Sequence, residues 1–210
     1  MTDHDDELTF FHCPRSRSAG VYTLLEELGA PYKLHLIDLK NGDTRKPEYL
    51  AINPMGKVPA LRHRGQLVTE QVAVYLYLAD LFPQAGLAPA LDDPLRGPYL
   101  RWMAFYGSSF EPGLIDRTQK RTPAPLALSP YGDYETMMKT VLDQLAAGPW
   151  MLGERYSAVD VLWGSALAWT TGFGIVEKSQ PVAAYLERFH ARPAVQRATA
   201  KNTELAESLG

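Results

Sequence analysis

The sequence is poor in cysteine and has no long apolar run. Its single cysteine, Cys13, has no second cysteine with which to form a disulfide within the chain. No segment approaches the roughly 20 consecutive apolar residues that span a bilayer. The acidic start, residues 1–7, lacks the positive charge and the apolar stretch of a secretory signal. These absences predict a cytoplasmic protein without a membrane span.

The chain also lacks a large excess of charge of either sign. Its 21 Lys and Arg residues against 24 Asp and Glu residues give a formal net charge of -3, with no long block of like charge. Such a distribution creates no extended field for nucleic acid or anionic lipid. The five histidines have no spacing typical of metal ligands. We therefore expect a small-molecule partner, with no nucleic acid, membrane or metal bound.

What the chain does have is enough apolar sequence for a large core, 46% of 210 residues. The first half alternates between strand and helix periodicity, and Leu34 and Leu36 fall on one face of a predicted strand. The expected elements are a strand over 8–12, a helix over 18–28, a strand over 32–39, a short helix over 47–52, a hairpin over 58–61 and 66–68, and a helix over 71–82.

The second half shows only helical patterns. Proline and glycine cluster between residues 85 and 98, which predicts a linker. Ser157 and Asp160 have the spacing of a capping box, a structural role at the start of a helix. Helices are expected at about 96–110, 133–147, 158–171, 182–191 and 195–208.

Three groups of residues could carry chemistry, and the first is residues 13–18 between the first strand and the first helix. Cys13 and Ser16 lie there beside backbone N–H groups at a helix N-terminus, an environment that favours an anion such as a thiolate. A serine before a helix is also a common cap, so the motif alone leaves the structural alternative open.

The second group is residues 53–61, where Pro59 follows a tight turn and begins a strand. An X-Pro bond adopts the cis form far more readily than any other peptide bond. If Val58-Pro59 is cis, the backbone of Val58 can face outward and pair with an extended peptide as an added strand.

The third group is residues 69–71, at the start of the helix over 71–82. Backbone N–H groups there can bind a carboxylate, while the carboxylate of Glu70 can accept from an amine. The structural alternative is that Thr69 caps the helix and Glu70 complements its dipole.

Together these groups make the chain resemble the glutathione transferase family over nearly its whole length. The matching segments are Ser16-Arg17-Ser18 with residues 24–32, residues 53–61, Glu70-Gln71 with residues 77–80, the capping box, and residues 192–195. The resemblance implies an α/β thioredoxin-like domain over 1–84, a linker over 85–95 and an all-α domain over 96–210. It also implies a cytoplasmic homodimer with a role in detoxification.

In this family glutathione lies along the thioredoxin-like domain. The resemblance implies that Val58 pairs with the cysteinyl unit, that Pro59 is the cis-proline, and that Lys57 approaches the glycyl carboxylate. Glu70 and the backbone at Gln71 would hold the γ-glutamyl end. Many relatives have serine at the position of Gln71, so the resemblance carries over the backbone contact there but not the contact of the serine hydroxyl.

The resemblance assigns Ser16 to the hydroxyl that hydrogen-bonds the glutathione sulfur, so that the thiolate attacks a small electrophile. Cys-Pro-Arg-Ser also resembles glutaredoxin-type motifs, and Cys13 could instead form a mixed disulfide with glutathione. This leaves a thiol–disulfide reductase as the alternative enzyme. A third possibility, from another class, is a non-catalytic binding protein that keeps the fold.

Relatives bind the second substrate against residues of the helical half. Trp102, Phe105 and Tyr106 in its first helix are the candidates for this pocket. Aromatic residues at helical spacing are more often part of the core, which is the structural alternative for each of the three.

Overall fold

The computed structural model describes residues 7–122 and 124–210, so the acidic segment 1–6 used in the argument on secretion lies outside it. The chain divides into two compact units. Unit 1 comprises the chain up to Ala85 together with Arg192–Gly210, and unit 2 comprises Gly86–Ala191.

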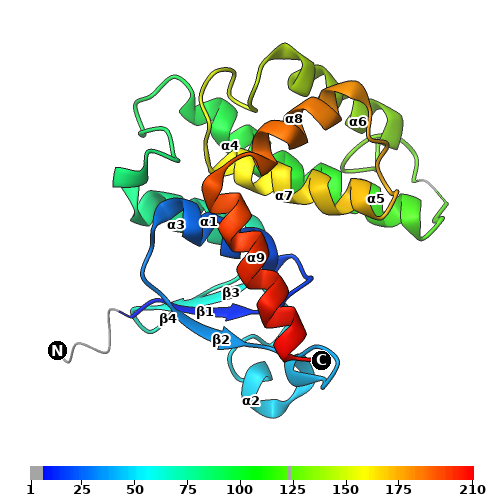
Figure 1. Cartoon of the computed structure of the whole chain (residues 1–210). Coiled ribbons are helices and arrows are strands. Elements are labelled where there is room, and N and C mark those ends of the chain that lie inside the picture. Colours follow the sequence, from blue (N-terminus) through cyan, green and yellow to red (C-terminus); the bar gives the residue numbers. More distant parts are fainter. Residues whose placement is uncertain (1–6, 123) are drawn as a thin grey trace. The chain divides into compact units, whose positions relative to one another are not determined.

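Unit 1 is built on a mixed four-stranded sheet (Figure 1). Its strands lie in the order β2-β1-β3-β4. β1 pairs parallel with β2, whereas β3 pairs antiparallel with both β1 and β4. The predicted strand and helix order of this half is confirmed. The strand bounds are β1 Thr9–His12, β2 Lys33–Leu36, β3 Ala60–His63 and β4 Gln66–Val68.

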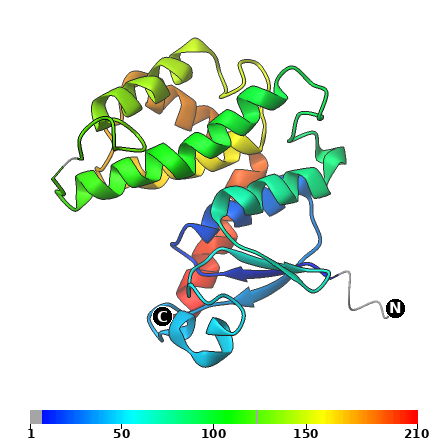
Figure 2. The ribbon, with the colours of Figure 1, turned by 180° about the vertical axis from the view of Figure 1, so that it is seen from behind.

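The helices of unit 1 cover both faces of this sheet. Helices α1 (Ser18–Leu28) and α3 (Gln71–Leu81) lie on one face, and the short α2 (Pro47–Leu50) lies on the other (Figures 1 and 2). Because side chains alternate along a strand, β1 sends Phe11 towards α2, where it packs against Tyr49, and sends His12 towards α1. Short 3₁₀ turns at Asp43–Arg45 and Pro83–Ala85 complete the unit.

The last helix, α9 (Pro193–Ser208), belongs to unit 1, so this division differs from the expected helical domain over 96–210. α9 runs beside α1 (Figures 1 and 2) and buries a stripe of small apolar residues. Arg192 pairs with Glu27 at 2.6 Å, and Lys201 pairs with Glu26 at 2.9 Å. Helical periodicity alone could not show which unit would receive this apolar stripe.

Unit 2 is helical, and one of its helices was not predicted. A helix continues beyond the expected end at residue 110, because α4 passes through a π-helical turn into α5. Pro112 does not interrupt it, because it lies just after the π-helical turn, where the regular ladder of helical hydrogen bonds already changes. The elements are α4 Arg96–Phe105, the π turn Tyr106–Phe110, α5 Glu111–Thr118, α6 Tyr134–Ala147, α7 Ala158–Gly172 and α8 Gln180–His190.

The predicted capping box at the start of α7 is confirmed. The backbone N–H of Ser157 donates to Asp160 at 2.9 Å, and the Ser157 hydroxyl is 3.2 Å from the same oxygen. The other carboxylate oxygen accepts from the N–H of Met151 at 2.7 Å and from the hydroxyl of Tyr185 at 3.0 Å. Asp160 therefore joins three segments of unit 2.

Substitution of Gly164 on α7 is expected to lower stability. A Cβ at this position would lie 2.5 Å from the ring of Phe189, a contact that forces α7 and α8 to shift. Overpacking of this kind costs about 1–3 kcal/mol, so the Gly164→Ala variant should unfold at lower urea concentration. Gly172→Ala, with open space at the end of the same helix, is the matched control. Equal stability of the two variants would contradict the predicted clash.

Candidate functional site

The loop between β1 and α1 carries the candidate serine. Ser16 is partly exposed, whereas Ser18, the first residue of α1, is fully buried. The Ser16 hydroxyl donates to the carbonyl of Cys13 at 2.7 Å and accepts from the backbone N–H of Ser18 at 3.1 Å. Arg15 has a φ of 59°, the left-handed conformation that turns the loop towards the helix. Two backbone contacts thus hold the Ser16 hydroxyl, which stays partly exposed.

Ser18 is fixed by buried partners. Its oxygen accepts from the backbone N–H of Cys13 at 3.0 Å and lies 2.9 Å from Nδ1 of His12. Nε2 of His12 lies 2.9 Å from Oδ1 of Asn202 on α9. Burial lowers the pKa of His12 to about 4, so the ring is neutral at physiological pH. Sequence reasoning did not identify these contacts, although a histidine on the buried face of β1 was a signal for them.

The thiol of Cys13 lies in the core of unit 1. Its side chain packs in a cluster with Phe11, Ile37 and Tyr49, and the residue is 4% exposed. Burial raises the pKa of the Cys13 thiol, and the nearby carboxylate of Asp38 raises it further. Since the thiolate is the reactive form of cysteine, this environment disfavours reactivity.

Cys13 is therefore expected to react slowly with an aromatic disulfide reagent. A buried thiol with a raised pKa has little accessible thiolate, so modification at pH 7.5 should be at least about 10-fold slower in the native protein than in urea. Spectrophotometric titration of the released aromatic thiol measures both rates. Equal rates would show that the thiol is available in the native protein.

The Val58-Pro59 bond is cis. Ala60 pairs with Phe11, so Val58-Pro59 lies at the end of the sheet where β1 enters the Cys13 loop. The carbonyl of Lys57 accepts from the hydroxyl of Tyr49 at 2.7 Å and from the side-chain amide of Asn53 at 2.8 Å. Within the described residues, the N–H and C=O groups of Val58 make no hydrogen bond. An extended peptide could pair with them.

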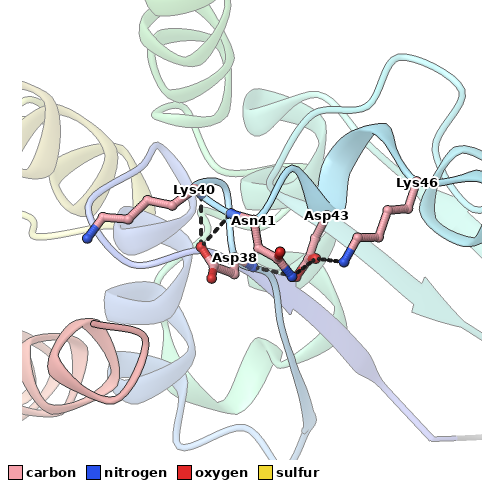
Figure 3. Close-up of polar contacts among 5 residues, drawn as sticks. All are labelled: Asp38, Lys40, Asn41, Asp43 and Lys46. Carbon is pink, nitrogen blue, oxygen red and sulfur yellow. Dashed lines mark hydrogen bonds and ion pairs between the residues drawn. The ribbon is translucent and has the colours of Figure 1, made fainter.

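A polar loop, residues 38–46, joins β2 to α2. Figure 3 shows its side chains, with the carboxylates of Asp38 and Asp43 turned into the loop. Asp38 accepts from the backbone N–H groups of Lys40 and Asn41, at 2.8 and 3.2 Å. Asp43 accepts from the N–H of Asp38 at 2.9 Å and from Nζ of Lys46 at 2.6 Å. The hydrogen bond from Lys46 lowers the pKa of Asp43 and keeps it ionised. These contacts order the chain as it enters α2.

The start of α3 is the third part of the site. Glu70 has a φ of 63°, is exposed, and immediately precedes α3. The side chain of Gln71 donates to the carbonyl of Arg17 at 3.3 Å, so the helix start contacts the loop that carries Ser16. The candidate residues of unit 1 therefore gather at one end of its sheet, with the exposed side chain of Lys57 at the same end.

The three aromatic candidates of unit 2 surround Trp163. Trp102 and Tyr106 are buried, and their ring centroids each lie 5.8 Å from that of Trp163. Phe105 remains partly exposed, with its ring centroid 5.3 Å from that of Trp102. Of the three, Phe105 is the one with surface left to contact a ligand.

Comparison with known proteins identifies the family. Residues 6–80 match the model of the glutathione S-transferase N-terminal domain. A solved glutathione transferase from Methylococcus capsulatus is 32% identical, with a TM-score of 0.79 over 93% of this chain and 98% of that one. The chain belongs to the glutathione transferase family. A transferase-family structure from a sphingomonad, complexed with glutathione, is 29% identical, with a TM-score of 0.74 over 93% and 98% of the two chains.

Two curated relatives of this transferase-family chain differ in their named activities. Glutathione S-transferase GstA of Escherichia coli O157:H7 is 28% identical over 90% of this chain and 96% of its own length. Disulfide-bond oxidoreductase YfcG of Escherichia coli K12 is 27% identical over 92% and 95%. Relatives of this chain are therefore named both as transferases and as a disulfide oxidoreductase.

Among the described helices of this chain, none is long and apolar enough to cross a bilayer. Within residues 7–122 and 124–210, no three histidine, cysteine, aspartate or glutamate residues are placed to hold a metal ion.

Proposed function

We propose that this chain is a glutathione transferase that joins the glutathione thiolate to a small electrophile, with Ser16 stabilising the thiolate. The observation that carries the proposal is the contrast between Ser16 and Cys13. The Ser16 hydroxyl is partly exposed at the start of α1, whereas the Cys13 thiol is buried and burial raises its pKa. This contrast favours a hydroxyl that activates glutathione over a protein thiol that reacts with it.

In the proposed complex glutathione lies across the sheet end that carries Val58. The N–H and C=O of Val58 pair with the cysteinyl unit, beside the cis Pro59. Glu70 accepts from the γ-glutamyl amine, the backbone N–H groups at Gln71 bind its carboxylate, and Lys57 approaches the glycyl carboxylate. The unbonded backbone of Val58 and the contact between Gln71 and the Arg17 carbonyl support this placement.

The proposed reaction has three steps at the sulfur. The thiol proton leaves to solvent, the Ser16 O–H donates to the resulting thiolate, and the thiolate attacks an electrophilic carbon and displaces an anion such as chloride. The N-terminus of α1 adds positive potential where the anion forms. On unit 2, Phe105 is the candidate contact for the electrophile, with Trp102 and Tyr106 behind it. We also propose a cytoplasmic homodimer with a role in detoxification, as the family resemblance implies.

The alternative is a glutathione-dependent disulfide reductase that uses Cys13. The observation that favours it is the relative named as a disulfide-bond oxidoreductase. In that reaction Cys13 would attack a disulfide and form a mixed disulfide, which glutathione would then reduce. A non-catalytic binding protein is a third candidate, supported by glutamine at position 71 where many relatives have serine.

Calorimetric titration with reduced glutathione, followed by two assays on the same samples, tests the proposal. The wild type and Cys13→Ala should bind glutathione and conjugate a chloronitrobenzene at similar rates. Disulfide reduction that depends on Cys13 would support the reductase instead. Absence of binding at millimolar glutathione would contradict both the transferase and the reductase and favour the non-catalytic protein.

A further inference from the structure

A chain of hydrogen bonds runs from α9 to the loop that carries Ser16. It begins at Oδ1 of Asn202, passes through both ring nitrogens of His12 and continues to Oγ of Ser18, with 2.9 Å at each of these contacts. Oγ of Ser18 lies 2.8 Å from Oγ of Ser16. His12 and Asn202 are 190 positions apart in the sequence, yet both belong to unit 1.

The atoms at the Asn202 end determine the tautomer of His12. An amide oxygen accepts hydrogen bonds and cannot donate, so the hydrogen of the neutral ring lies on Nε2. Nδ1 is then an acceptor, and the hydroxyl of Ser18 donates to it. The described contacts of His12 are with Phe10 and Tyr22, at ring centroid distances of 5.3 and 5.0 Å, and with Ser18 and Asn202. None of these four is a carboxylate, ammonium or guanidinium group, so the described contacts bring no formal charge against the ring.

In this arrangement Ser18 closes the loop between β1 and α1. With its hydrogen donated to His12, Ser18 accepts from the N–H of Cys13 and so holds the end of β1 to the start of α1. Ser16 is held separately, by the backbone N–H of Ser18 on its oxygen. Its own hydrogen, directed at the Cys13 carbonyl in this structure, is therefore not needed to close the loop and can turn to a ligand.

We propose that His12 and Asn202 are positioning residues that orient the Ser18 hydroxyl and thereby leave the Ser16 hydrogen for the glutathione sulfur. The inference rests on the proposed role of Ser16. Loss of the Asn202 oxygen would leave Nε2–H without an acceptor, so the hydrogen would move to Nδ1. The Ser18 hydrogen would then go to the Cys13 carbonyl, which already lies 2.9 Å from the Ser18 oxygen, or to Ser16. Because the Cys13 carbonyl also accepts from Ser16, either change would misdirect the Ser16 hydrogen.

The experiment measures the pKa of the glutathione thiol in the complex, from the ultraviolet absorbance of the thiolate. Asn202→Ala should raise this pKa by about one unit. At a pH below the pKa, this shift lowers the amount of thiolate about tenfold. The affinity for glutathione should stay nearly unchanged. Lys201→Ala is the control, because it removes a contact of α9 with α1 but does not touch His12. Ser16→Ala is the reference for complete loss of the hydroxyl. Melting temperatures show whether each variant is folded.

The outcomes separate the inference from the proposed function. A raised thiol pKa in Ser16→Ala and Asn202→Ala, with none in Lys201→Ala, supports the inference. If only Ser16→Ala raises it, or if Lys201→Ala raises it as much as Asn202→Ala, the inference fails and the role of Ser16 stands. If Ser16→Ala does not raise it, both fail.

Nitrogen-15 NMR of the wild-type histidines tests the tautomer directly. The inference predicts that His12 carries its hydrogen on Nε2 in the free protein. A His12 ring with its hydrogen on Nδ1 would overturn the inference without any assay of activity.

Discussion

Ser16→Ala is expected to lower kcat/KM for conjugation of a chloronitrobenzene by about 100-fold, the typical effect of removing one donor from a developing anion. Glutathione affinity should change little, because the proposed binding contacts come from the backbone of Val58 and from Glu70. Steady-state kinetics gives the first quantity, and calorimetry gives the second. The combination separates a residue that stabilises the thiolate from one that binds the peptide.

A remote serine provides the matched control for this substitution. Ser208 is exposed near the end of α9, and its hydroxyl donates to the nearby carbonyl of Leu205 at 2.7 Å. Ser208→Ala should therefore keep the wild-type rate. Full activity in Ser16→Ala would remove Ser16 from the proposed mechanism.

Asp160→Ala is expected to destabilise the protein by about 3 kcal/mol or more. The substitution removes the acceptor for the N–H groups of Ser157 and Met151 and for the hydroxyl of Tyr185, all of which are buried. Each buried donor left without a partner costs about 1–3 kcal/mol. Urea unfolding measures the loss, and an unchanged free energy of unfolding would contradict the structural role of the capping box.

The Asp160→Asn variant isolates the pH dependence of this site. Burial raises the pKa of Asp160 from 3.8 to about 6, so between these values the folded state binds a proton that the unfolded state releases. The stability that protonation of Asp160 adds is therefore present below about pH 4 and is lost as pH rises through about 6. Because asparagine does not titrate, the wild type should lose about 3 kcal/mol relative to Asp160→Asn over this range. A wild type that gains stability relative to Asp160→Asn as pH rises would contradict the sign.

The elements of unit 1 could be predicted because periodicity and turn residues agree along this part of the sequence. Leu34 and Leu36 fixed the face of β2, and Arg64-Gly65 adopts the positive φ values of a tight hairpin turn. In unit 2 the same local rules missed α5, since Pro112 and Gly113 normally interrupt a helix. Here Pro112 lies just after the π-helical turn, and the helix continues through it.

The candidate site was only partly accessible from sequence. Ser16, Val58 and Glu70 stand in short motifs next to predicted element ends, and the pairing of β1 with β3 brings two of these motifs together. His12 and Asn202 belong to no motif, and their contact depends on how α9 packs in unit 1. The burial of Cys13 was also beyond reach, because it depends on Tyr49 of α2 and on the whole sheet.

The most direct test of the account compares the conjugation rates of Cys13→Ala and Ser16→Ala at saturating glutathione with one chloronitrobenzene. The account predicts a rate near that of the wild type for Cys13→Ala and a loss of about 100-fold for Ser16→Ala. The reverse order, with activity lost in Cys13→Ala and kept in Ser16→Ala, would contradict it and assign the chemistry to the thiol.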